Sequence, residues 1–509
     1  MRKKIGIYVL LTLCCAAAMA AEKAVDADQP ALTIYNQNFA VVRHSIALDL
    51  KSGVNRVRFS DATAHIEPDS VMLRDAGGRP LQVLEQNYRN DPVSQELLLS
   101  LFEGQAIDFL VRDQNKSEIV KGKIIRSGYV PHWLAMSRYG AQYYQAQMSY
   151  AGGGAGQPII EVGGKLQFQL PGLPQFPALT DNTILKPTLD WLIQVEQPVS
   201  STGELSYITG GMSWHADYNV VAPSQGDKLD LIGWVTIDNQ SGRDFREARI
   251  KLMAGDVNKI QPQEARDMLY NAAGTIGRLE RAPAVSEKTF DEYHLYSLQR
   301  SSTLHDRETK QVEFVRATGI NSQRIYVYDG AKIDVNRYGY YTPDQIRNDQ
   351  GYGTESNPKI WVMQEFKNAK ANNLGMPLPA GRLRFYRRDV DGGQLEFTGE
   401  NLIDHTPSDE TVRVYTGNAF DIVGERRRTN FRIDESRHMI DESFEITLRN
   451  HKKAPVEVRV VERLYRCVNW DLMAKSHSFR KLDSHKIEFP VRVPADGQQV
   501  VTYTVHYTW

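Results

Sequence analysis

Cysteine is scarce in this sequence. The 509-residue chain has three, and two of them, Cys14 and Cys15, stand near its N-terminus. Removal of a leader there would leave only Cys467, and one thiol cannot form an internal disulfide. A disulfide framework of the kind that stabilises small secreted domains is therefore excluded. A chain of this length can bury enough apolar surface to do without one.

An excess of one charge is lacking as well. The chain has 61 Lys and Arg residues against 62 Asp and Glu residues, a formal net charge of −1. That balance indicates neither nucleic acid nor an anionic lipid surface as a partner. The run Arg426-Arg427-Arg428 is a local exception. We interpret it as protection of an edge strand against aggregation rather than as a nucleic-acid site.

Catalytic and metal-binding signatures are also missing. The 12 histidines form no HExxH or HxH pattern, and no GxSxG occurs. Activation of Cys467 by His477 or His485 is one alternative, since a thiolate nucleophile needs an adjacent base. Its setting, LYRCVNW, alternates like a strand and favours a buried small side chain. We expect no catalytic residue, no bound metal and no cofactor.

The apolar run Ile5 to Leu13 is too short to span a bilayer. It follows the basic residues Arg2-Lys3-Lys4 and precedes the small residues Ala18-Met19-Ala20. This pattern predicts a signal peptide that is cleaved after Ala20. We expect a protein exported to the periplasm or the cell surface of a bacterium, with no transmembrane segment after cleavage.

Alternation of apolar and polar residues, typical of strands, is abundant. It is strongest after Phe431, as in Phe444–Arg449 and in Val501–Trp509 at the end of the chain. The clearest short helix is Asp91 to Phe102, capped by Ser94 or Asp91, with an apolar stripe of Leu97, Leu98 and Leu101. The sequence predicts an all-β fold with minor α content, built from several β-sandwich or immunoglobulin-like domains and a small β-barrel-like N-terminal region.

Four segments are expected along the chain. Residues 1–20 form the signal peptide, 21–90 an N-terminal β domain, and 91–198 a small β domain with a Tyr/Gly-rich loop. Residues 199–509 form a β-sandwich module, and its last part, about 411–509, is an immunoglobulin-like sandwich.

The stretch Leu205 to Val257 holds the most conspicuous cluster of side chains that carry chemistry. Because successive residues of a strand face opposite ways, Trp214, Ala216 and Tyr218 share one face and are expected in the core. His215 and Asp217 fall on the other face, as a lone polar pair with no nucleophile nearby.

Several short runs in this chain are typical of one bacterial family. They are Trp214–Tyr218, Gly233–Asn239, Ala248–Leu252 leading into Ala254–Val257, Pro379–Arg382 before Phe385–Arg387, Phe397–Glu400, His405–Pro407, Ala419–Asp421 and Asn469–Trp470, with Lys186–Trp191 nearer the N-terminus. On these runs the chain resembles the domain of unknown function 4139 family, relatives of the mucoidy inhibitor proteins. The resemblance covers roughly residues 199–509 and more weakly Leu32 to Leu192.

This resemblance implies the fold and the compartment only, because the family has no established activity from which to transfer catalytic residues. Such proteins often carry a coiled coil between an N-terminal β domain and the C-terminal module. This chain has no heptad run, so assembly through a coiled coil is not expected.

Two Tyr-rich loops are the remaining candidates for function. Exposed aromatic rings stack on sugars or on protein partners, so we predict a binding role for Tyr139, Tyr143, Tyr144, Tyr338, Tyr340, Tyr341 and Tyr352. The alternative is that these rings pin their loops onto the sandwiches.

The sequence thus predicts a non-enzymatic cell-envelope protein that binds a protein or a glycan. Two alternatives stay open, a hydrolase of envelope polymer and a purely structural or assembly subunit. The oligomeric state is left open.

Overall fold

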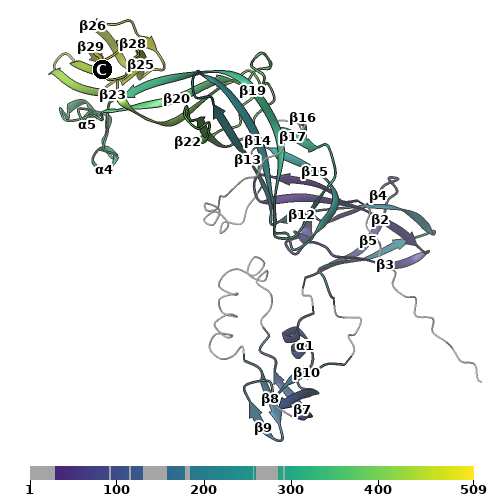
Figure 1. The fold of residues 1–509 in the computed structure, drawn as a ribbon. Coiled ribbons are helices and arrows are strands. Elements are labelled where there is room, and N and C mark those ends of the chain that lie inside the picture. The colour runs from purple at the N-terminus through teal and green to yellow at the C-terminus, as the bar shows by residue number, and fades with distance from the viewer. Residues whose placement is uncertain are drawn as a thin grey trace, which may run out of the picture. The chain divides into compact units, whose positions relative to one another are not determined.

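The structure is a computed structural model that describes residues 29–90, 93–113, 116–129, 157–177, 184–255, 257–259, 285–290 and 293–509 (Figure 1). Strands dominate it, which confirms the predicted all-β class. Contacts divide the chain into two compact units that alternate along the sequence. The first unit contains Val41–Gly210 and Ser241–Ala248; the second contains Leu32–Ala40, Gly211–Gln240 and Arg249–Trp509. The expected division at residues 90 and 198 stays a prediction. No helix in the described ranges is long and apolar enough to cross a bilayer.

The first unit contains a three-stranded antiparallel sheet in which β11 lies between β3 and β5. Its strands are β3 (Gly53–Ser60), β5 (Gln82–Arg89) and β11 (Thr188–Val195). Trp191 is fully buried, and its indole N–H donates to Oε1 of Gln86 at 2.8 Å. Asp190 faces the other way, where Nη2 of Arg56 lies 2.6 Å from its Oδ2. Side chains alternate between the two faces of β11, so one face belongs to the core and the other carries charged groups.

A small five-stranded sheet follows in the same unit. Its order is β10 (Leu173–Gln175), β6 (Ala106–Asp113), β7 (Lys116–Arg126), β8 (Ile159–Val162) and β9 (Lys165–Gln167). Helix α1 (Gln95–Leu101) begins at Ser94, whose Oγ accepts a hydrogen bond from the N–H of Leu97, so the predicted Ser94 cap is confirmed. The predicted stripe is wrong in part. Leu99 joins the core, whereas Leu101, the last residue of the helix, is 52% exposed.

Six further elements lie between residues 31 and 254. They are β1 (Ala31–Tyr35), β2 (Phe39–Leu50), the 3-10 turn η1 (Pro68–Ser70), β4 (Met72–Asp75), β12 (Val199–Gly210) and β15 (Phe245–Ala254). β12 pairs with β4 in antiparallel register.

A histidine is buried in the first unit. His44 is 2% exposed, its ring centroid lies 5.0 Å from that of Phe59, and its Nε2 lies 3.1 Å from Nη1 of Arg243. Burial, helped by the charge of Arg243, lowers the pKa of His44 from 6.5 to about 3. The imidazole is therefore neutral in the folded protein and accepts the hydrogen bond from the guanidinium.

This burial predicts a loss of stability in mild acid. Between pH 7 and pH 5 the unfolded chain takes up a proton at His44 that the folded protein does not, so the free energy of unfolding falls by about 2 kcal/mol. Urea unfolding at the two pH values measures the loss. The variant His44→Leu should be less stable at pH 7 and should lack this part of the pH dependence. An equal fall with pH in both proteins would refute the assignment to His44.

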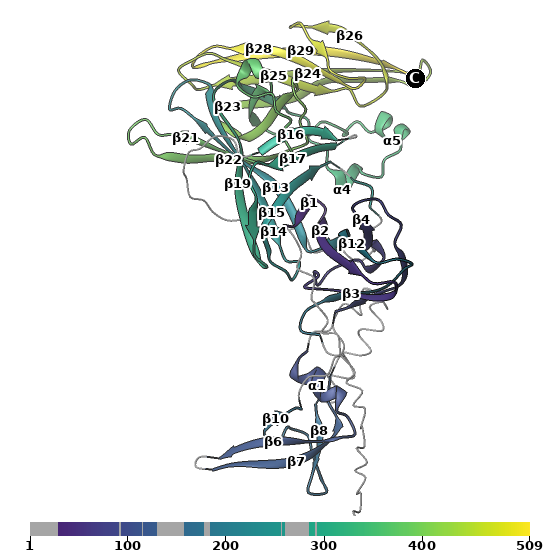
Figure 2. The ribbon, with the colours of Figure 1, turned by 90° about the vertical axis from the view of Figure 1, so that its right-hand side faces the viewer.

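The second unit is built on a mixed sheet in the order β22-β21-β13-β14-β19-β20-β23-β24-β29-β26. Its first seven strands are β22 (Leu395–Ile403), β21 (Gly381–Arg388), β13 (Met212–Ala222), β14 (Lys228–Asn239), β19 (Glu308–Asp329), β20 (Lys359–Lys367) and β23 (Thr411–Asp434). β19 and β23 are so long that each runs on from the middle of the sheet toward the C-terminal strands (Figures 1 and 2).

The C-terminal strands form a sandwich within this unit. β24 (Met439–Asn450), β29 (Gly497–Thr508) and β26 (Asn469–Lys475) face β25 (Val456–Arg463), β28 (Lys486–Val493) and β27 (Arg480–Lys481). Their alternating apolar residues, among them Ile446, Val458 and Val501, make one fully buried core. Burial of such side chains stabilises by about 1.5–3 kcal/mol each.

The predicted faces of β13 are confirmed. Trp214, Ala216 and Tyr218 are all buried. The indole N–H of Trp214 donates to the carbonyl of Met253 at 3.1 Å, and the hydroxyl of Tyr218 donates to the carbonyl of Pro379 at 2.7 Å. The same unit also contains β16 (Val285–Phe290), β17 (Tyr293–Leu298) and β18 (Ser302–Leu304).

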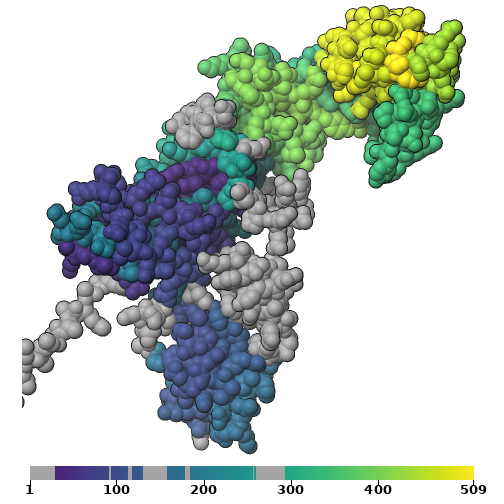
Figure 3. Space-filling model, turned by 180° about the vertical axis from the view of Figure 1, so that it is seen from behind, coloured from purple at the N-terminus to yellow at the C-terminus, as the bar shows by residue number. Residues whose placement is uncertain are grey.

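The segment after β19 contains two short helices where the sequence predicts a loop. They are α4 (Val335–Tyr338) and α5 (Pro343–Asn348), followed in the chain by the 3-10 turn η3 (Lys370–Asn372). α5 begins with a capping box between Thr342 and Gln345 and has Pro343 in its first turn, a signal readable from the sequence. α4 and α5 lie beside the C-terminal sandwich (Figure 3).

Candidate functional site

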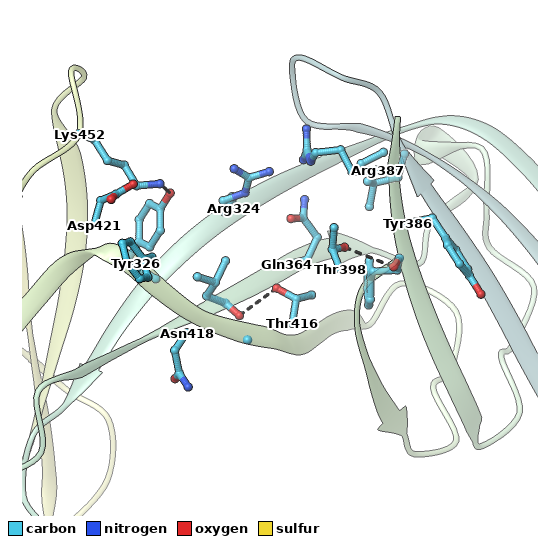
Figure 4. Close-up of a pocket in the computed structure, with 17 residues that line it drawn as sticks. Arg324, Tyr326, Gln364, Tyr386, Arg387, Thr398, Thr416, Asn418, Asp421 and Lys452 are labelled. Carbon is cyan, nitrogen blue, oxygen red and sulfur yellow. Dashed lines mark hydrogen bonds between the residues drawn. The ribbon is translucent and has the colours of Figure 1, made fainter. Parts of the chain in front are cut away.

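A hollow of about 380 Å³ lies in the second unit, where β19, β20 and β23 meet β21 and β22 (Figure 4). Its polar lining includes Arg324, Gln364, Arg387, Thr398, Thr416 and Lys452. These residues come from five strands and from the turn after β24, so they meet only in the folded chain.

Two β-bulges shape this hollow. The register shifts between Phe385 and Tyr386 where β21 pairs with β22, and between Val362 and Met363 where β20 pairs with β23. Gly399 in β22 has φ +151°, and a Cβ atom there would lie 2.2 Å from the carbonyl oxygen of Thr416 in β23. A side chain would thus collide with backbone. Glycine is needed where the two strands approach each other.

Hydroxyl and amide groups line the centre of the hollow. Oγ1 of Thr416 donates to the carbonyl of Val362 at 3.2 Å, and Oγ1 of Thr398 donates to the carbonyl of Phe385 at 3.3 Å (Figure 4). Gln364 is 5% exposed and donates through Nε2 to Oγ of Ser322 at 2.6 Å. These bonds hold the side chains in place and leave oxygen lone pairs available to a ligand.

Cations outnumber carboxylates in the lining, which has three cationic residues and one carboxylate, that of Asp421. Nη1 of Arg387 donates to the carbonyl of Pro223 at 2.8 Å, and Nζ of Lys452 donates to the hydroxyl of Tyr326 at 3.2 Å. Burial, together with the nearby charge of Arg324, holds the pKa of Arg387 below its usual value. The hollow is therefore a region of positive potential.

Aromatic rings flank the polar lining. Tyr386 lines the hollow, and its ring packs edge-on against that of Phe397 with the centroids 5.8 Å apart. Phe397 is 56% exposed, and Phe420, which lines the hollow from β23, is 95% exposed. An aromatic side chain so open to water offers its face to a ligand.

The groups of the lining are of the kinds that hold a ligand in place. The lining contains no histidine and no cysteine, and Asp421 is the single carboxylate among the described residues there, so it lacks the carboxylate pair that glycoside hydrolysis uses. Nor does any cluster of three or more His, Cys, Asp or Glu in the described ranges suit a metal ion.

His215 and Asp217 belong to a larger polar network elsewhere in the same unit, so the prediction of a lone pair is wrong. Oδ2 of Asp217 lies 3.2 Å from Nε2 of His215 and accepts from Oγ1 of Thr236 at 3.1 Å; Oδ1 accepts from Nη1 of Arg384 at 3.2 Å. Arg384 also reaches Glu400, with Nε 3.4 Å from Oε2.

Opposite charges balance in this network. Burial opposes ionisation of Asp217, but its hydrogen bonds and the charges of His215 and Arg384 hold its pKa below the usual value. The bond to Asp217 raises the pKa of His215 in turn. The groups satisfy one another, which indicates a structural role on the sheet surface.

The Tyr-rich loop predicted around α4 and α5 is largely an internal cluster. Tyr338 and Tyr352 are 5% and 8% exposed, and their ring centroids lie 5.1 Å apart. The hydroxyl of Tyr341 donates to Oδ2 of Asp349 at 3.1 Å, while Tyr340 is 94% exposed. Tyr139, Tyr143 and Tyr144 lie outside the described residues. A binding role for these tyrosines stays a prediction, and Tyr340 is the ring that the fold leaves open.

Two buried arginines attach this loop to the sandwich. Arg466 binds Glu442 through Nη2 at 3.0 Å and donates through Nη1 to the carbonyl of Asp349 at 2.7 Å. Arg426 binds both carboxylate oxygens of Glu462, at 3.0 and 2.9 Å, and donates to the carbonyl of Gly353 at 2.7 Å. The predicted edge-protecting role is thus wrong for Arg426. Although β23 pairs only with β24 at this position, the side chain of Arg426 is fully buried and binds Glu462.

Residues 204–509 match the family model described as Domain of unknown function (DUF4139). The chain belongs to this family. Comparisons with curated proteins and with solved structures find no match. Three of the runs typical of DUF4139 meet at the hollow: Phe385–Arg387, Thr398 of Phe397–Glu400, and Ala419–Asp421. The sequence prediction missed these residues as a site, although their grouping in those runs was a usable signal.

Proposed function

We propose that this DUF4139 protein is an exported, non-enzymatic protein of the bacterial cell envelope that binds a glycan in the hollow. The observation that carries the proposal is the lining, in which hydroxyl, amide and cationic groups lie beside exposed aromatic rings. Its volume of about 380 Å³ falls within the range of ligand sites. The basic and apolar start of the sequence supports export.

A glycan matches this mixture of groups. A sugar ring has an apolar face that packs on an aromatic ring such as Phe420, and hydroxyls on its rim that bond to Gln364, Thr398 and Thr416. Hydrolysis of the polymer would need two carboxylates about 5–10 Å apart. The single carboxylate in the lining favours binding over that alternative.

The test compares two exposed aromatic side chains. Phe420→Ala should weaken binding of envelope glycan fragments about tenfold, a loss of ~1.4 kcal/mol, without loss of stability, because Phe420 is 95% exposed. Tyr340→Ala is the matched control, since Tyr340 is 94% exposed and lies in the other candidate region. Affinity is measured by calorimetry with purified fragments. Loss of affinity with Tyr340→Ala and none with Phe420→Ala would move the site to the Tyr-rich loop and reject the hollow.

A further inference from the structure

The charge of two arginines in the hollow is not neutralised by the protein. Arg324 in β19 and Arg387 in β21 lie close enough for their charges to repel each other (Figure 4). In the described part of the chain, neither has a carboxylate at ion-pair distance; the bonds of Arg387 go to the carbonyls of Pro223 and Ser224. Asp227 acts on Arg387 only from farther away.

Several other arginines of the same sheet have acidic partners. Arg316 binds Glu313 at 2.6 Å, Arg413 binds Glu365 at 2.6 Å, and Arg384 binds both Asp217 and Glu400. Arg324 and Arg387 differ from these three arginines, because they line one hollow together and have no carboxylate at ion-pair distance among the described residues.

Half-buried cations that have no acidic partner attract an anion from outside. Arg324 and Arg387 are both partly buried, so the effective dielectric constant around them is lower than in bulk water and their field is stronger. A guanidinium presents a planar pair of N–H groups that matches the two oxygens of a carboxylate. Lys452 adds a third positive charge to the lining, which contains one negatively charged residue, Asp421.

We propose that Arg324 and Arg387 form a carboxylate-binding subsite, which makes an acidic glycan containing uronic acid the ligand class of the hollow. The proposal rests on the glycan binding proposed above and specifies it. The uronate carboxylate lies against the two guanidinium groups, while hydroxyls of the same chain bond to Gln364, Thr398 and Thr416 and a ring stacks on an aromatic face.

The experiment measures binding of the full chain to oligogalacturonate and to its methyl ester, which has the same sugars without the charge. The acid form should bind at least about tenfold more tightly at low salt, and added salt should reduce the difference. Arg324→Gln should remove most of this preference without changing affinity for the ester. Arg324→Lys, which keeps the charge, should restore part of it.

Arg388→Gln is the control, because Arg388 neighbours Arg387 but is exposed and outside the lining. Equal binding of acid and ester, unchanged by Arg324→Gln, would overturn the carboxylate subsite and leave glycan binding standing. Binding of poly-glutamate but of neither glycan would mean that the arginines recognise an acidic peptide, and glycan binding would then be the part that fails. Binding of none of the three overturns both proposals.

Discussion

The variant Arg426→Met should lose about 3–5 kcal/mol of unfolding free energy. The side chains of Arg426 and Glu462 are both 0% exposed, and the two carboxylate oxygens bind the guanidinium. Burial alone would lower the pKa of Arg426, but the carboxylate of Glu462 raises it well above its usual value, so the arginine stays charged. Its removal leaves the hydroxyl of Tyr503 as the one side-chain donor to the buried Glu462 among the described residues.

Arg427→Met is the matched control for this substitution. Arg427 is the next residue of β23 and faces the solvent side, where it pairs with Glu445 at 2.7 Å with 66% of its side chain exposed. An exposed pair of this kind contributes about 0–1 kcal/mol. Urea unfolding of both variants measures the difference. Similar losses at the two positions would show that the buried pair is not the source of the stability.

The double variant Arg426→Met with Glu462→Leu distinguishes the contribution of the ion pair to stability from the cost of leaving the carboxylate of Glu462 buried and unpaired. Replacement of both members by apolar side chains removes the unpaired carboxylate, so the double variant should regain much of the stability lost in Arg426→Met. It should not regain all, because the hydroxyl of Tyr503 loses its acceptor and the carbonyl of Gly353 loses one of its two side-chain donors. A double variant as unstable as the single one would contradict this account.

Gly399→Ala should cost about 3 kcal/mol and abolish ligand binding in the hollow. Gly399 has φ +151°, which L residues rarely adopt, and its new Cβ would meet the carbonyl oxygen of Thr416 at 2.2 Å. The atom in the way is backbone, so β22 and β23 have to move apart, and Thr398 and Thr416 move with them. Thermal unfolding and glycan affinity are the two measurements.

Gly393→Ala is the control for the backbone effect alone. Gly393 also has a positive φ, +66°, but nothing lies within 4 Å of the position its Cβ would take. We expect a loss of about 1 kcal/mol and unchanged binding. If the two variants were equally stable and both bound ligand normally, the close approach of β22 and β23 at Gly399 would not be what shapes the hollow.

Local sequence patterns predict those structural features that depend only on residues nearby in the chain, such as strand faces and helix caps. Because side chains alternate along a strand, Trp214 and Tyr218 lie on the same face of β13, which is the core face. Ser94 caps α1 through a hydrogen bond to a residue only three positions later in the chain. The capping box of α5 was readable in the same way, from Thr342 and Gln345, although the segment was interpreted as a loop. These features require no knowledge of what packs against them.

The partners of a charged side chain are a different matter. Arg426, Arg427 and Arg428 are three consecutive arginines that the sequence does not distinguish. Arg426 binds the buried carboxylate of Glu462 in β25, 36 residues later, while the side chain of Arg427 faces solvent. Alternation predicts that they face opposite ways but not which face the fold covers. The same holds for His215 and Asp217, which acquire Thr236 and Arg384 only when β14 and β21 pair with β13.

The sequence by itself determined the all-β class and the DUF4139 family, because each depends on short runs or on the alternation of side chains along a strand. Only the tertiary structure decided where the hollow lies. Arg324 and Arg387 are 63 positions apart, and their strands meet through β13, β14 and the bulges at Phe385 and Val362. Such long-range strand pairing and register set which side chains share a surface, and no local pattern encodes them.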